Sequence, residues 1–113
     1  MAFMDLSDNW RIRAILELQQ GEAARAVGNE GRARVCARRA MGVIAEEYFR
    51  RRGVFLTTPS AYDILRYLLS SKDITPDARE KTAHFLLRVD TDFSLPSDVD
   101  LLAEARWLAT ELL

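Results

Sequence analysis

The chain has 113 residues, nearly half of them apolar, and its 16 basic and 17 acidic side chains leave a formal charge of −1. This length predicts one domain with a single core, and the apolar content excludes a disordered chain. The balanced charge argues against a dedicated nucleic-acid binder, which usually has a strong basic excess, although it permits a local basic face.

The N-terminal segment MAFMDLSDNW lacks the basic region and apolar run of a signal peptide. No apolar stretch reaches the roughly 20 residues that a membrane span requires. The single cysteine, Cys36, can form no intrachain disulfide, which suits a reducing compartment. We therefore expect a soluble cytoplasmic protein with no membrane contact.

The first predicted helix covers residues 8–26, with Ser7 or Asp8 as its N-cap. The pair Gly28-Asn29 is typical of a turn and is expected to follow the helix. The apolar side chains of the helix are spaced as one stripe: Ile12, Ile15, Leu16, Ala23 and Val27.

A second long helix is predicted over residues 30–52, because Gly53 and the arginines before it suit a helix C-terminus. Small side chains let neighbouring helices approach closely, so we expect this helix to be central, with Cys36 as a buried thiol. Small and larger residues alternate along its inward side: Ala33, Cys36, Ala37, Ala40 and Ile44.

Three shorter helices are predicted over residues 59–71, 76–89 and 97–112, the last with Ser97 as its cap. The first two begin with the same device, a capping threonine followed by proline in the first turn. No strand pattern appears, so we predict an all-α, antiparallel up-down bundle of four or five helices. The two threonine-proline pairs are Thr58-Pro59 and Thr75-Pro76.

Arginine is abundant in the second helix, and two interpretations of it remain open. Glu46 with Arg50, and Glu47 with Arg51, have the acid-before-base spacing of salt bridges on a helix surface. Aromatic residues are scarce nearby, so stacking of single-stranded bases has little support. The alternative is a phosphate-binding or nucleotide-binding strip made of Arg32, Arg34, Arg38 and Arg39.

The only histidine, His84, follows Arg79 by five positions in REKTAH. A metal-independent ribonuclease needs an imidazole to move the 2′-hydroxyl proton and a guanidinium to hold the scissile phosphate. Residues five apart on one helix point about 140° away from each other, so this pair would need a symmetric dimer to act together. The competing interpretation is a half-exposed histidine on an amphipathic helix.

Self-association is expected from the size of the bundle. A bundle this small often buries its remaining apolar surface against a second copy, so we predict a homodimer. No spacing of His, Cys, Asp or Glu argues for a metal site, and no cofactor is expected. The larger aromatic residues have apolar neighbours and suit a core or a dimer interface: Trp10, Trp107, Tyr62 and Tyr67.

The segment GNEGRARVCARRAMGVIAEEYFRRRG (28–53) resembles the second helix of HEPN domains, small helical domains named for higher-eukaryote and prokaryote nucleotide binding. Residues 87–113 are similar to the loop and last helix of the same family. The resemblance implies an antiparallel bundle of four or five helices, usually dimeric. It is carried by Gly28-Asn29, Cys36-Ala37, Arg38-Arg39-Ala40 and Gly53.

The resemblance also implies a choice between two functions. Some HEPN domains are toxin ribonucleases with an Arg, four to six residues, His motif in the dimer cleft, which Arg79 and His84 match. Others are non-catalytic nucleotide-binding modules or partners of nucleotidyltransferases. Our leading expectation is a non-catalytic module associated with nucleotide or RNA, of the toxin-antitoxin or nucleotidyltransferase-partner type. The alternatives are the ribonuclease and a purely structural homodimeric domain.

Overall fold

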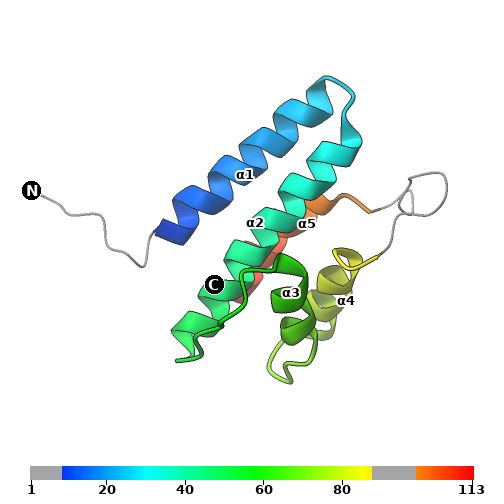
Figure 1. The fold of residues 1–113 in the computed structure, drawn as a ribbon. Helices are drawn as coiled ribbons and strands as arrows, with labels where there is room; N and C mark the ends of the chain where they lie inside the picture. The colour runs from blue at the N-terminus through cyan, green and yellow to red at the C-terminus, as the bar shows by residue number, and fades with distance from the viewer. Residues whose placement is uncertain (1–8, 88–98) are drawn as a thin grey trace, which may run out of the picture.

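The computed structural model describes residues 9–87 and 99–113, which form five α-helices joined by turns and loops. No strand occurs in these two ranges, so the predicted all-α class is confirmed for them. Figure 1 shows the helices in chain order: α1 (Asn9–Ala26), α2 (Glu30–Arg51), α3 (Ala61–Leu69), α4 (Pro76–His84) and α5 (Leu101–Leu112).

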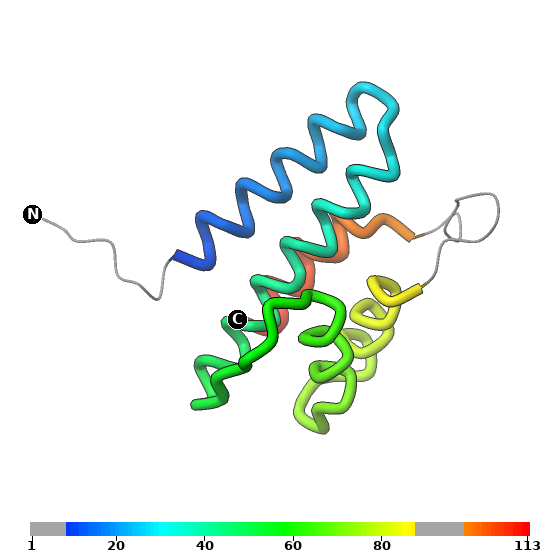
Figure 2. Tube along the Cα trace, viewed as in Figure 1, coloured from blue at the N-terminus to red at the C-terminus, as the bar shows by residue number. Residues whose placement is uncertain are grey.

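The two long helices form an antiparallel hairpin, and α2 lies at the centre of the fold. Helices α1 and α2 run side by side in opposite directions (Figure 2). On its other sides α2 contacts α3 and α5, while α4 packs on α3 and α5. The central position that the small residues of this helix predicted is therefore observed.

The inward side of α2 is almost completely buried. The helix begins at its N-cap Asn29, whose side chain accepts a hydrogen bond from the Arg32 N–H. It ends before Gly53, whose φ of 77° is accessible at low cost only to a residue without a Cβ. The five residues predicted to face inward are each at most 1 % exposed: Ala33, Cys36, Ala37, Ala40 and Ile44.

The first helix has the predicted spacing, but its apolar stripe faces away from the core. Ile12, Ile15 and Leu16 are 40 %, 46 % and 51 % exposed, and Ala23 and Val27 are exposed as well. Helix α1 can approach α2 and α5 more closely along another face, on which most side chains are small. This face is the one that packs against the core. The buried residues of α1 are Ala14, Leu18, Gly21 and Ala24.

The start of α3 also differs from the prediction. Its N-cap is Ser60 and not Thr58, and the Ser60 hydroxyl accepts from the Asp63 N–H at 3.3 Å. The Thr58 hydroxyl accepts from the Ser60 N–H at 3.1 Å and so holds the turn before the helix. Both residues can cap, and packing decides between them, because Ala61 at the first helical position lies directly against Gly42 of α2.

Helix α4 begins as predicted. Thr75 is the N-cap, its hydroxyl accepts from the Ala78 N–H at 3.1 Å, and Pro76 occupies the first turn. The helix ends at His84, earlier than the predicted residue 89. The Phe85 carbonyl just beyond it accepts a hydrogen bond from the Arg38 side chain of α2, so it is satisfied without a further helical turn.

Arg25 joins three helices at one end of the bundle. Its guanidinium lies 2.7 Å from Glu30 at the start of α2 and 3.1 Å from Asp100, the N-cap of α5. The bond to Glu30, with that to Asp100, raises the pKa of Arg25 against the effect of burial. Burial opposes ionisation of Asp100, but bonds from the Ala103 N–H and Arg25 lower the pKa of this carboxyl. The predicted cap of α5, Ser97, lies outside the described residues.

Candidate functional site

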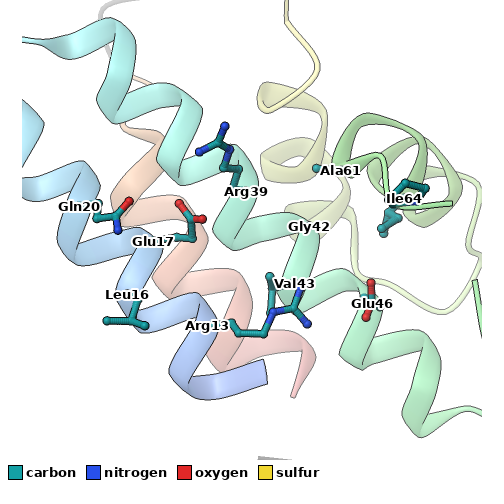
Figure 3. Close-up of a pocket in the computed structure, with 11 residues that line it drawn as sticks. Arg13, Leu16, Glu17, Gln20, Arg39, Gly42, Val43, Glu46, Ala61 and Ile64 are labelled. Atoms are coloured by element: carbon teal, nitrogen blue, oxygen red, sulfur yellow. The ribbon is translucent and has the colours of Figure 1, made fainter. Parts of the chain in front are cut away.

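A cavity of about 370 Å³ opens between α1, α2 and the start of α3 (Figure 3). Its volume lies in the range of small-ligand sites. Helices α1 and α2 supply most of the wall, and Pro59 with the first turn of α3 completes it. The lining residues are Arg13, Leu16, Glu17, Gln20, Arg39, Gly42, Val43, Glu46, Pro59, Ala61 and Ile64.

Gly42 accounts for the close approach of α2 and α3 beside this cavity. A Cβ placed on Gly42 would lie 2.7 Å from the Cβ of Ala61, which is too close for any residue other than glycine. Glycine inside a helix costs about 1 kcal/mol relative to alanine. The cavity wall is therefore bare of a side chain at this position because the packing requires it.

Two arginines from different helices line the cavity without an ion pair or hydrogen bond to any described residue. They are Arg13 of α1 and Arg39 of α2. In Figure 3 the Arg13 side chain extends from α1 toward Val43 on α2. An unpaired guanidinium group at a cavity wall is available to an anionic ligand, since it has five N–H donors in a planar arrangement.

Two carboxylates, Glu17 and Glu46, line the same cavity. The Oε2 atom of Glu17 is buried and accepts no hydrogen bond from any residue that the structure describes. A buried polar atom without a partner costs free energy, which a hydrogen-bond donor from a ligand would recover. The cavity thus offers both cationic and anionic groups from facing helices.

The four arginines of the predicted strip divide between two sides of α2. Arg32 and Arg39, seven positions apart, are exposed on one side. Arg34 and Arg38 are half-buried on another, and the Arg38 Nε donates to the Phe85 carbonyl at 2.9 Å. The structure therefore presents Arg39, and not all four arginines together, to a ligand in the cavity.

The salt-bridge interpretation applies to the C-terminal end of α2. The carboxylate of Glu47 is only 3 % exposed and lies 2.6 Å from Arg50 and 2.8 Å from Arg51. The bond from Arg50, with that from Arg51, outweighs the effect of burial and lowers the pKa of Glu47. The predicted pair Glu47 with Arg51 is confirmed.

Arg79 binds the end of α3. Its guanidinium donates to the Leu69 carbonyl and, at 2.8 Å, to the Ser71 carbonyl. The last carbonyls of a helix have no partner within that helix, so Arg79 satisfies groups that α3 leaves open. This contact connects α4 to α3.

His84 faces a different neighbour. Its Nδ1 donates to Glu104 of α5 and lies 2.9 Å from both carboxylate oxygens. The two side chains are 24 % and 13 % exposed. Within one copy, Arg79 and His84 are therefore directed to α3 and α5 respectively, as residues five apart on a helix should be, and each has an intrachain partner.

Within the described residues no group of three or more His, Cys, Asp or Glu side chains could hold a metal ion. None of the helices in those ranges has both the length and the apolar content of a membrane span. No family model, curated protein or solved structure matches the chain.

Sequence reasoning did not identify the half of the cavity that α1 contributes. Arg13, Glu17 and Gln20 lie between the outward apolar stripe and the buried face of that helix, so their place depends on which face meets the core. It also missed Glu104 as the partner of His84. The available signal was Gly42, because a glycine in the middle of a helix indicates a close approach of another element.

Proposed function

We propose that this protein is a non-catalytic helical module that binds a nucleotide in the cavity between α1 and α2. The observation that carries the proposal is that Arg13 and Arg39 line one cavity of about 370 Å³ and pair with no described residue. Guanidinium groups form charge-assisted and often bidentate hydrogen bonds with phosphate, so the phosphate group of a ligand is assigned to one of them, Arg39, while Arg13 supplies a second positive charge elsewhere on the cavity wall (Figure 3).

The remaining wall suits the other parts of a nucleotide. Leu16, Val43 and Ile64 supply apolar surface for a base. Glu17 and Glu46 accept hydrogen bonds from sugar hydroxyls or from an exocyclic amine. A ligand with both anionic and donor groups matches this mixture of charges better than inorganic phosphate does.

The resemblance of residues 28–53 to HEPN domains supports the same function, since Arg39 belongs to that stretch. The proposal includes a HEPN-like bundle that acts as a homodimer, with RNA or a nucleotidyltransferase as the partner class in a toxin-antitoxin setting. The cavity is built within one copy, so nucleotide binding and self-association can be tested separately. Ribonuclease activity is not part of the proposal, because Arg79 and His84 both have intrachain partners.

Calorimetric titration of the full chain with ATP, AMP and adenosine tests the proposal. We expect the two phosphate-bearing ligands to bind and adenosine to bind more weakly. Arg39→Gln should lower the affinity for AMP about tenfold or more, because hydrogen bonds to charged groups contribute roughly 1.5–3 kcal/mol and 1.4 kcal/mol is tenfold.

Arg32→Gln is the matched control, since Arg32 carries the same charge on the same exposed side of α2 but does not line the cavity. Its affinity for AMP should equal that of the unchanged chain. An equal loss in both variants would assign the binding to diffuse surface charge. Absence of binding at about 1 mM nucleotide would contradict the proposal outright.

A further inference from the structure

The outward face of α1 is an apolar surface that no described residue covers. Ile12, Ile15 and Leu16 are 40 %, 46 % and 51 % exposed, and Ala23 continues the face along the helix. Figure 2 shows α1 at the outer edge of the bundle, with α2 on its inner side. Single exposed apolar side chains are ordinary, but a contiguous row of them marks an interaction surface.

One line along this face, which includes the polar Gln19 and leaves Ile15 at its side, has the spacing of a helix-packing seam. Ile12, Leu16, Gln19, Ala23 and Ala26 follow each other at alternating steps of four and three residues, which is the heptad pattern of two helices packed along their length. From the first to the last of these residues the helix rises about 21 Å at 1.5 Å per residue. A seam of this length fits another helix of similar length.

The charges beside the seam select the partner and its direction. On the helix wheel, Arg11 and Glu22 lie on one edge of the seam and Arg13 lies toward the other. Two parallel copies would place Arg11 beside Arg13 of the second copy, which is repulsive. Two antiparallel copies related by a twofold axis near residues 16 and 17 would place Arg11 beside Glu22 of the second copy, a carboxylate that also lies 3.1 Å from Arg106 of its own chain.

We infer that the outward face of α1 is the contact between two copies of this chain, packed antiparallel through Ile12 and Ile15, with Leu16 at the border between this contact and the nucleotide cavity. The face is self-complementary in this orientation, in both its apolar row and its charges, which is the requirement of a twofold interface. This inference deepens the homodimer of the proposed function and does not depend on nucleotide binding.

Sedimentation of the full chain tests the contact. The unchanged chain should be a dimer, and Ile15→Glu should raise the dissociation constant of the dimer at least tenfold, because it places a charge on the apolar face directly beside the seam. Ile15 does not line the nucleotide cavity, so AMP binding by this variant should be unchanged. Phe55→Glu, which alters a more exposed apolar residue (78 %) outside α1, should leave the dimer intact.

A charge exchange tests the direction. Arg11→Glu and Glu22→Arg should each weaken the dimer by up to about fivefold, and the double variant should recover most of that loss. A monomeric unchanged chain at about 100 µM, or an unchanged dimer in Ile15→Glu, would overturn the contact. A double variant weaker than both single variants would overturn the antiparallel packing.

Discussion

Helices α1 and α2 are both long and both rich in apolar residues, yet they use those residues in opposite ways. Helix α2 turns its apolar side chains inward and is buried along most of its length, with Ile44 and Tyr48 at most 1 % exposed. Helix α1 packs through a face of small residues and one larger residue, Leu18, and leaves Ile12 and Ile15 outside. The size of the side chains, and not their hydrophobicity alone, decides which face of a helix meets its neighbours.

The difference between the packed faces of α1 and α2 has a physical basis in the distance between helices. Helices that approach closely gain dispersion contacts along their whole backbones, and only small side chains permit such an approach. Apart from Leu18, the larger side chains of α1 do not enter the space between α1, α2 and α5, where Gly21 lies directly against Leu102 and Cys36. These larger side chains therefore remain exposed on the outward face of α1.

The sharpest test of this contrast is a pair of identical substitutions in the two helices. Ile44→Ala should lower the free energy of unfolding by about 3 kcal/mol, since Ile44 is fully buried and the substitution leaves a cavity. Ile15→Ala should change it by less than about 0.5 kcal/mol when measured at protein concentrations where the copies are separate. Urea unfolding of both variants measures the two free-energy changes. Similar losses of unfolding free energy would refute the contrast between α1 and α2.

A buried charge distinguishes the C-terminal end of α2 from the exposed arginines elsewhere on the helix. Glu47→Gln should lower the free energy of unfolding by about 2 kcal/mol at pH 7, because Arg50 and Arg51 lose their carboxylate partner. The neighbouring Glu46→Gln, in an exposed side chain, should have almost no effect.

The difference in unfolding free energy between the unchanged chain and Glu47→Gln should also depend on pH. The folded chain lowers the pKa of Glu47 from its ordinary value of 4.5, so the stabilisation is complete above that pH. As the pH falls through the lowered folded pKa, the carboxylate is protonated and the stabilisation disappears. Urea unfolding between pH 7 and about pH 2 should show the difference between the unchanged chain and Glu47→Gln shrinking on acidification. A difference that stays constant would show that the charge is not its cause.

The smallest effect concerns the glycines that set the helix spacing. A Cβ on Gly21 would lie 2.6 Å from the Leu102 Cδ2 and 3.2 Å from the Cys36 Cβ, so Gly21→Ala should destabilise the fold by about 1 kcal/mol despite its better helix propensity. Gly31→Ala on α2 meets only an Asn29 oxygen at 3.9 Å and should stabilise by about 0.5 kcal/mol. Thermal unfolding should show a lower Tm for Gly21→Ala and a higher Tm for Gly31→Ala. A change of Tm in the same direction for both variants would argue against close packing at Gly21.

The sequence predicted those features of the fold that depend on local chemistry. The Thr75-Pro76 start of α4, the Gly53 end of α2 and the buried Cys36 each follow from one or a few neighbouring residues. The face of α1 and the start of α3 depend on contacts between distant segments, such as Gly21 with Leu102 and Gly42 with Ala61. Periodicity shows that a helix has two kinds of face, but tertiary packing decides where each face goes.

The candidate site was predictable only in part, for the same reason. Arg39 was singled out because phosphate chemistry favours arginine, and the structure places it at a cavity wall. Its cavity partners Arg13 and Glu17 come from α1. Periodicity alone could not show which face of that helix meets the core. The partners of Arg79 and His84, on α3 and α5, likewise lie on other elements that no local pattern specifies.

The position of Arg25 affects how the helix ends unfold. Its guanidinium connects the end of α1 to the cap of α5 across 75 positions of sequence, while the same group holds the first residue of α2. Helix ends ordinarily fray independently, at little cost in free energy. Here three helix ends share one side chain, so opening any of them also loses an ion pair of Arg25. Because these side chains are one-third to one-half exposed, we expect this to add about 1 kcal/mol or less to the cost of opening at this end of the bundle.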